Sequence, residues 1–158
     1  YNIANAFTVS SGSLFMVGWD STGSFPYTRC MGFGGQYGSP YQLCFFGYSD
    51  PNGYSFLFRN TGDGGMTQGG LSTVAGLKAF GIVKTGNNVV YYDNSTTPVA
   101  YGSSVSGVYG FNTVGYRSYG IDQPSTGYLG DVAWFNSALS NTDAANIITY
   151  LKTLYGIA

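Results

Sequence analysis

Hydrophobic and polar positions follow two different periods in residues 127–157, GYLGDVAWFNSALSNTDAANIITYLKTLYGI. From Tyr128 to Asn136 the period is two, and both faces carry bulky side chains. One face holds Tyr128, Gly130, Val132 and Trp134, and the other holds Leu129, Asp131, Ala133 and Phe135. This pattern predicts a buried strand that lies between two layers.

A helical period begins directly after that strand. Ser140 is a candidate N-cap, and Asp143 three residues later completes a capping-box pattern and places a negative charge in the first turn. One helical face then collects the apolar residues Ala144, Ile147, Ile148, Leu151 and either Leu154 or Tyr155. Lys152 lies in the last turn, and Gly156 is placed to end the helix in the left-handed conformation. We expect a helix over about Asn141 to Tyr155 that covers β-structure.

The chain before this helix consists of short runs of branched and aromatic residues separated by Gly, Pro and Asn. A spacing of roughly 8–12 residues between such runs is typical of an all-β sandwich or barrel. The expected strands cover residues 7–9, 13–19, 28–33, 41–48, 54–59, 77–84, 89–93, 98–102 and 108–116. Asp50 to Gly53 and Thr85 to Asn88 predict turns, and Asn60 to Gly70 predicts a glycine-rich loop without the Lys of a phosphate-binding loop. No linker interrupts the pattern, so residues 1–158 are expected to form a single domain.

Composition narrows the class of protein. Charged residues make up 8% of the chain, and there are 25 glycines and 15 tyrosines, whereas typical domains are about a quarter charged. Such a composition is common in extracellular and virion-surface proteins. The net charge is -1 and the six basic residues are scattered, which argues against a nucleic-acid partner. No apolar run approaches the roughly 18 residues that a membrane span needs, and a chain that begins at Tyr1 is expected to be processed or part of something longer.

Four segments together resemble the concanavalin A-like, laminin-G-like jelly-roll domains. They are FTVSSGSLFMVGW, GIVKTGNNVVYYDNSTTPV, FNTVGYR and the C-terminal stretch with its Gly-Asp strand, "ALS" turn and terminal helix. The resemblance implies a two-sheet antiparallel jelly-roll sandwich with one C-terminal helix packed beside it. Members of this family include lectins, glycan-binding modules, adhesion domains, glucanases and domains of phage fibres, so function must be argued from a site.

Catalytic residues are the next question. The chain has no His and no Glu, so it lacks a Ser-His-Asp triad and the paired Glu motif that the resemblance implies for glucanases. The seven aspartates lie in separate segments and suit turns and caps. Asp131, beside Trp134, is interpreted as part of the fold signature with no carboxylate partner. We therefore predict that the protein is not an enzyme.

Two tyrosine-bearing segments are the candidate ligand-binding residues, because sugar binding uses aromatic platforms with amides or carboxylates. They are Gln36, Tyr37 and Tyr41 in one segment and Tyr116, Arg117, Tyr119 and Asp122 in the other. The alternative is that these tyrosines fill half-buried strand ends or contact other proteins.

No cofactor is required by the sequence, but Ca²⁺ has candidate ligands. Asp50, Asn52 and Asp63 are oxygen donors of the right type in loops. Ordinary turn chemistry is the alternative explanation for all three residues.

Two covalent features are also predicted. A symmetric hairpin with its tip near Tyr37 would place Cys30 opposite Cys44 and allow a disulfide, while two buried free thiols are the alternative. Asn94-Ser95-Thr96 is an N-glycosylation sequon.

These observations predict a non-catalytic, surface-displayed binding domain that recognises a glycan or a cell-surface receptor, as in adhesion by a virion fibre or a secreted protein. The alternative is a structural or decoration subunit whose tyrosine-rich surface contacts neighbouring protein chains, including other copies of itself.

Overall fold

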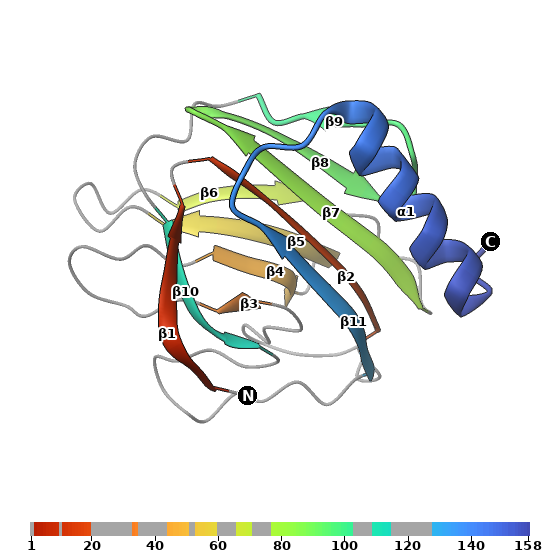
Figure 1. The fold of residues 1–158 in the computed structure, drawn as a ribbon, viewed down its shortest axis with the longest axis horizontal. Helices are drawn as coiled ribbons and strands as arrows, with labels where there is room; N and C mark the ends of the chain where they lie inside the picture. The colour runs from red at the N-terminus through yellow and green to blue at the C-terminus, as the bar shows by residue number, and fades with distance from the viewer. Residues whose placement is uncertain are drawn as a thin grey trace.

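A computed structural model describes residues 2–9, 11–19, 33–34, 44–50, 53–59, 66–70, 77–102, 109–114 and 128–158, with side chains at 11–18, 77–102 and 128–158. The elements, shown in Figure 1, are β1 (Asn2–Val9), β2 (Gly12–Trp19), β3 (Phe33–Gly34), β4 (Cys44–Asp50), β5 (Gly53–Arg59), β6 (Met66–Gly70), β7 (Lys78–Thr85), β8 (Asn88–Asp93), β9 (Val99–Ala100), β10 (Tyr109–Val114), β11 (Tyr128–Phe135) and α1 (Asn141–Tyr155).

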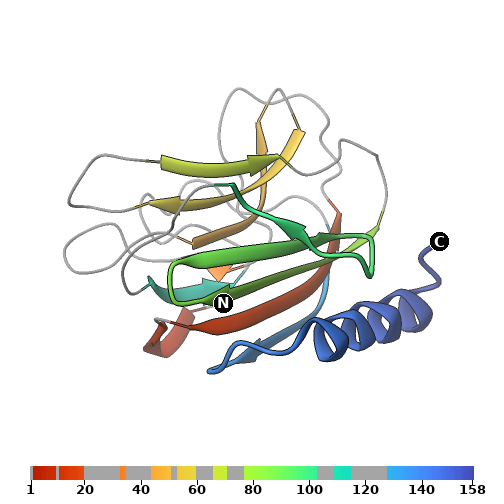
Figure 2. The same ribbon diagram turned by 90° about the horizontal axis from the view of Figure 1, so that it is seen from above.

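The strands form antiparallel sheets. A five-stranded sheet has the order β11-β2-β7-β8-β9, and two three-stranded sheets have the orders β1-β10-β3 and β4-β5-β6. Strands from the two ends of the chain are neighbours, because β2 pairs with β11 and β1 pairs with β10. Figure 2 shows α1 on one side of the five-stranded sheet and the β4-β5-β6 sheet on the other side. The protein is therefore mostly β with one C-terminal helix, as the sequence predicts.

Local signals define the helix as expected. The Ser140 hydroxyl accepts a hydrogen bond from the Asp143 backbone N–H at 3.1 Å and donates one to the Asp143 carboxylate at 2.7 Å. Gly156 ends the helix with φ 62°, a left-handed conformation that costs glycine little. The predicted bounds of the helix are confirmed.

The core lies between α1 and the five-stranded sheet. Its buried members are Phe15, Val17, Ala79, Val83, Tyr92, Ala144, Ile148 and Leu151. The packing is close at Gly81, where an added Cβ would lie 2.7 Å from a ring carbon of Phe15. The hairpin of β7 and β8 supplies much of this layer, and it pairs Thr85 with Asn88 across the predicted turn.

Two sequence-based expectations about strands are wrong. β11 is not buried on both faces, because it forms an end of the five-stranded sheet in the described part of the chain, with Tyr128 48% and Val132 37% exposed. The predicted loop Asn60 to Gly70 contains β6, which pairs with β5 from Ser55↔Gly70 to Arg59↔Met66. Pairing with a neighbour outweighs the weak strand propensity of its two glycines.

The predicted cysteine hairpin is not tested by the described residues, which include Cys44 but not Cys30. β3 pairs with β10, whereas β4 pairs with β5, where Cys44 lies opposite Phe58. Cys30 lies outside the described residues, so a Cys30–Cys44 disulfide stays a prediction. β4 and β5 do form a hairpin across the predicted turn, with Asp50 paired to Gly53.

The described residues contain one helix, α1. It is not long and apolar enough to cross a membrane.

Candidate functional site at the edge strand β11 and helix α1

A β-bulge in β11 determines which side chains meet α1. Leu129 pairs with Gly18 and Val132 pairs with Met16, so three steps along β11 match two steps along β2. Because of the extra residue, each β11 side chain before the bulge points to the opposite face of the sheet from the one that strict alternation predicts. Tyr128, which strict alternation groups with Val132, therefore lies on the helix-facing side of the sheet.

Tyr155 at the end of α1 occupies the bulge. Its hydroxyl oxygen accepts a hydrogen bond from the Asp131 backbone N–H at 2.8 Å. Its ring packs edge-on against the ring of Tyr128, with 6.3 Å between centroids and an angle of 71°. We call Tyr128, Asp131 and Tyr155 the β11–α1 cluster.

Gly130 is the residue that allows Tyr155 to approach the strand. A Cβ built at Gly130 would lie 2.7 Å from the Tyr155 hydroxyl oxygen and 2.8 Å from ring atom Cζ. Contacts that short do not occur without rearrangement, so a side chain at residue 130 would displace the Tyr155 ring. The glycine in the Gly-Asp sequence of this strand is explained by that contact.

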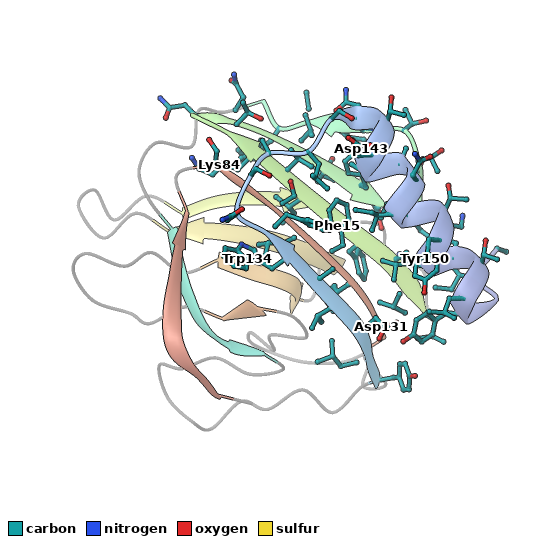
Figure 3. All side chains as sticks on the ribbon, in the orientation of Figure 1. Phe15, Lys84, Asp131, Trp134, Asp143 and Tyr150 are labelled. Carbon is teal, nitrogen blue, oxygen red and sulfur yellow. The ribbon has the colours of Figure 1, made fainter. Side chains whose placement is uncertain are left out.

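The cluster combines a solvent-exposed ring with a solvent-exposed carboxylate. Tyr128 is 48% exposed and Asp131 is exposed, while Tyr155 is half-buried between them. Figure 3 shows Asp131 on β11, near the C-terminal part of α1. Burial is the main cause that raises the pKa of Tyr155; the hydrogen bond from the Asp131 N–H opposes this shift, and the Asp131 carboxylate adds to it. The Tyr155 phenol therefore keeps its proton at neutral pH and is not a ready nucleophile.

Two buried lysines, Lys78 and Lys84, lie on the face of the five-stranded sheet that points away from α1. The Lys78 ammonium is 3.9 Å from the Asp93 carboxylate, and the Lys84 ammonium donates a hydrogen bond to the Gly86 carbonyl. Burial lowers the pKa of both lysines, and Asp93 opposes that shift at Lys78. Lys78 and Lys84 are buried, at 3% and 4% exposed. These groups are enclosed by the fold, so we assign them a structural role.

The ligand-binding residues predicted from the sequence lie outside the described residues, and the structure neither assembles nor separates them. They are Gln36, Tyr37, Tyr41, Tyr116, Arg117, Tyr119 and Asp122. The Ca²⁺ prediction also stays open, because Asp50 ends β4 while Asn52 and Asp63 lie outside the described ranges. Where side chains are described, no group of three or more His, Cys, Asp or Glu residues could hold a metal ion.

The predicted sequon residue Asn94 has a structural role. Its φ is 53°, and its side-chain oxygen accepts from the Ala79 N–H at 3.4 Å while its Nδ2 donates to the Ala158 carbonyl at 3.1 Å. The Asn94 carbonyl accepts from Lys152 of α1 at 3.0 Å. Asn94 thus ties the end of β8 to the C-terminal segment, and its glycosylation remains a prediction.

Sequence reasoning missed Tyr128 and Tyr155 as surface residues of a site. Period-two alternation placed Tyr128 on the wrong face, and the helical pattern allowed Tyr155 to be a core residue. The signal that could have found them is the Gly130-Asp131 pair in a strand, since an isolated glycine in a strand often marks a bulge or a close approach.

Comparison with known proteins gives likeness in structure alone. No protein-family model and no curated protein matches the sequence. The Trypanosoma rangeli sialidase in complex with sialic acid is similar, with a TM-score of 0.65 at 14% identity over 90% of this chain and 23% of that chain. Domain 4 of AbnA, a GH43 extracellular arabinanase from Geobacillus stearothermophilus in complex with arabinotriose, has a TM-score of 0.58 at 12% identity over 88% of this chain and 66% of that one.

A third similar structure concerns botulinum neurotoxin type C, whose cell entry is dependent upon interaction with two ganglioside molecules. It has a TM-score of 0.55 at 10% identity, covering 89% of this chain and 36% of that chain. At these identities the likeness shows the fold. This chain spans less than a quarter of the sialidase and about a third of the toxin chain.

The prediction that the protein is not an enzyme is wrong, because it excluded catalysis for a fold that enzymes also have. Similar structures include sialidases, one of them a mutant displaying trans-sialidase activity. The prediction relied on missing His and Glu residues and on the absence of a motif from glucanases, whereas the similar structures described above include sialidases. The absence of those residue types therefore does not decide whether the protein takes part in catalysis, and the likeness itself assigns no activity.

Proposed function

We propose that this chain is a glycan-recognition domain and that it binds sugar at the β11–α1 cluster. One observation carries the proposal: Tyr155 packs against the half-exposed Tyr128 ring and accepts a hydrogen bond from the backbone N–H of Asp131, whose exposed carboxylate acts on the Tyr155 hydroxyl. An aromatic face packs against the C–H face of a sugar ring, and a carboxylate accepts hydrogen bonds from its hydroxyls.

The comparisons support this choice of ligand class. The sialidase structure contains sialic acid, the arabinanase domain contains arabinotriose, and the neurotoxin interacts with gangliosides. Three different glycan-handling proteins thus use the fold that this chain adopts. One of the three is described as extracellular, which agrees with the low charge and high tyrosine content of this chain.

Within the same proposal, residues 1–158 form one laminin-G-like jelly-roll domain. Antiparallel pairing between strands from opposite ends of the chain supports this topology. The segments containing Tyr37 and Tyr119 are retained as a second candidate glycan surface. Display on a virion fibre or a secreted adhesin is the setting in which such a domain would act as a receptor-binding head.

The experiment compares two exposed tyrosines. Tyr128→Ala removes the ring from the cluster, whereas Tyr150→Ala removes a ring that is 63% exposed elsewhere on α1. On a glycan array followed by calorimetry, we expect Tyr128→Ala to weaken binding about tenfold or more, which corresponds to about 1.4 kcal/mol. Tyr150→Ala should bind like the parent protein. Equal binding by both variants, with unchanged melting temperatures, would contradict the proposed site.

Assembly through α1 is a second candidate function. Tyr150 and Leu154 lie one turn apart on α1 and are 63% and 53% exposed, which favours contact with a second copy of the chain. In that case the same two variants give the opposite pattern: Tyr150→Ala disrupts an oligomer detected by light scattering, and Tyr128→Ala does not.

A further inference from the structure

The charge of the β11–α1 cluster restricts the kind of sugar that it can accept. Asp131 contributes an exposed negative charge at the bulge. The neighbouring Tyr155 contributes none at neutral pH, because a phenol ordinarily has a pKa of about 10 and burial raises that of Tyr155 further. An acidic sugar brought against this surface would place one carboxylate beside another.

Each lysine whose side chain is described interacts with a group outside the β11–α1 cluster. Lys78 faces Asp93 on the sheet face away from α1, and Lys84 donates to the Gly86 carbonyl at the β7–β8 turn. Lys152 leaves α1 toward β8, where it donates to the Asn94 carbonyl at 3.0 Å. In the part of the chain whose side chains are described, no lysine is therefore placed to neutralise a ligand carboxylate at the cluster.

We propose that the β11–α1 cluster selects neutral sugars bearing adjacent hydroxyl groups and rejects sugars that carry a carboxylate. This inference rests on the proposed function and deepens it. In this arrangement the Asp131 carboxylate, which also acts on the Tyr155 hydroxyl, accepts hydrogen bonds from hydroxyls of a sugar whose ring lies against Tyr128. A hydroxyl-to-carboxylate hydrogen bond is charge-assisted and is roughly twice as strong as a neutral one, whereas two carboxylates side by side repel each other.

A matched pair of ligands tests this selection directly. Lactose and 3′-sialyllactose share a neutral core, and only the second carries a carboxylate; arabinotriose serves as another neutral probe. A glycan array that displays neutral and acidic glycans at the same density should give signals confined to neutral glycans. Calorimetry on the best neutral ligand and its sialylated form should show at least tenfold weaker binding of the sialylated form.

Two substitutions at one residue separate charge from shape. Asp131→Asn keeps the size of the side chain and the backbone N–H that Tyr155 binds, and it should weaken neutral-sugar binding about tenfold. Asp131→Lys should reverse the preference and raise binding of 3′-sialyllactose above that of the parent protein. Asp143→Asn, on the N-terminal turn of α1, is the matched control and should leave binding unchanged.

The outcomes distinguish the two levels of the proposal. Binding to glycans with a preference for sialylated forms, or with no loss in Asp131→Asn, overturns the neutral-sugar inference and leaves glycan recognition intact. No binding to any glycan on the array overturns both.

Discussion

At the scale of single residues, three tyrosines have different roles because their side chains are buried to different extents. Tyr92 is fully buried in the core and donates a hydrogen bond from its hydroxyl to the Asn141 side-chain oxygen at 3.2 Å. Tyr155 is half-buried and holds the β11 bulge, and Tyr150 is mostly exposed. The count of tyrosines therefore says little about function until each hydroxyl and ring has been placed.

Tyr92 supplies a prediction about pH. Burial raises the pKa of Tyr92 above the ordinary value of about 10 for a tyrosine, so the folded state keeps this proton to higher pH than the unfolded state does. The contribution of Tyr92 to stability is present below about pH 10 and is lost as pH rises through the raised pKa. In Tyr92→Phe this loss should disappear, and urea unfolding measured from pH 7 to 11.5 should show a shallower alkaline decline than in the parent protein.

At pH 7 the same variant should be less stable by about 1 kcal/mol, because the hydrogen bond to Asn141 is missing.

Lys78 and Lys84 change the pH dependence of stability in the opposite direction. Burial lowers the pKa of each lysine, so their contribution to stability rises as pH approaches 10.5. Both lysines are present in both proteins, so their effect cancels in the difference. Parallel alkaline curves for parent and variant would contradict the assignment to Tyr92.

At the scale of elements, the junction of β11 with α1 depends on a strand residue that has no side chain. Gly130→Ala places a Cβ 2.7 Å from the Tyr155 hydroxyl oxygen, and we expect it to lower the free energy of unfolding by about 1–3 kcal/mol. Chemical denaturation measures this loss. The displaced ring should also change the near-ultraviolet circular dichroism.

Gly102→Ala is the control for that substitution, because nothing lies within 4 Å of a Cβ built there. It should be neutral, or stabilising by about 0.4–1 kcal/mol through the unfolded state. If Gly130→Ala were as well tolerated as Gly102→Ala, Tyr155 would not be held in the bulge as described.

The same two elements show what a sequence can and cannot predict. α1 was predictable to its ends, because Ser140, Asp143 and Gly156 act within one turn of the positions that they define. β11 was predictable as a strand, but its bulge and its place at the end of a sheet depend on pairing with β2, far away in the sequence. The strand β6 was missed for the same reason, since its partner β5 and not its own composition makes it a strand.

At the scale of the whole molecule, a mostly β fold with one C-terminal helix follows from the sequence, while the jelly-roll topology and the site do not. Spaced strands, the β7–β8 hairpin and the C-terminal helix were expected, and they form the sheet and core on which the cluster is built. The predicted ligand residues belong to segments that lie outside the described residues, whereas the cluster combines β11 with α1 across a bulge. Similarity to glycan-handling proteins at 10–14% identity supports the fold and leaves the ligand to be measured.

The central claim is that sugar binds at the β11–α1 cluster, and amide chemical-shift mapping tests it most directly. Isotope-labelled protein is titrated with the neutral glycan that gives the strongest array signal. We predict that the largest shifts occur at the backbone amides of Tyr128, Asp131 and Tyr155. Shifts confined to residues 36–41 and 116–122, with none at the cluster, would contradict the claim and assign recognition to these two tyrosine-bearing segments instead.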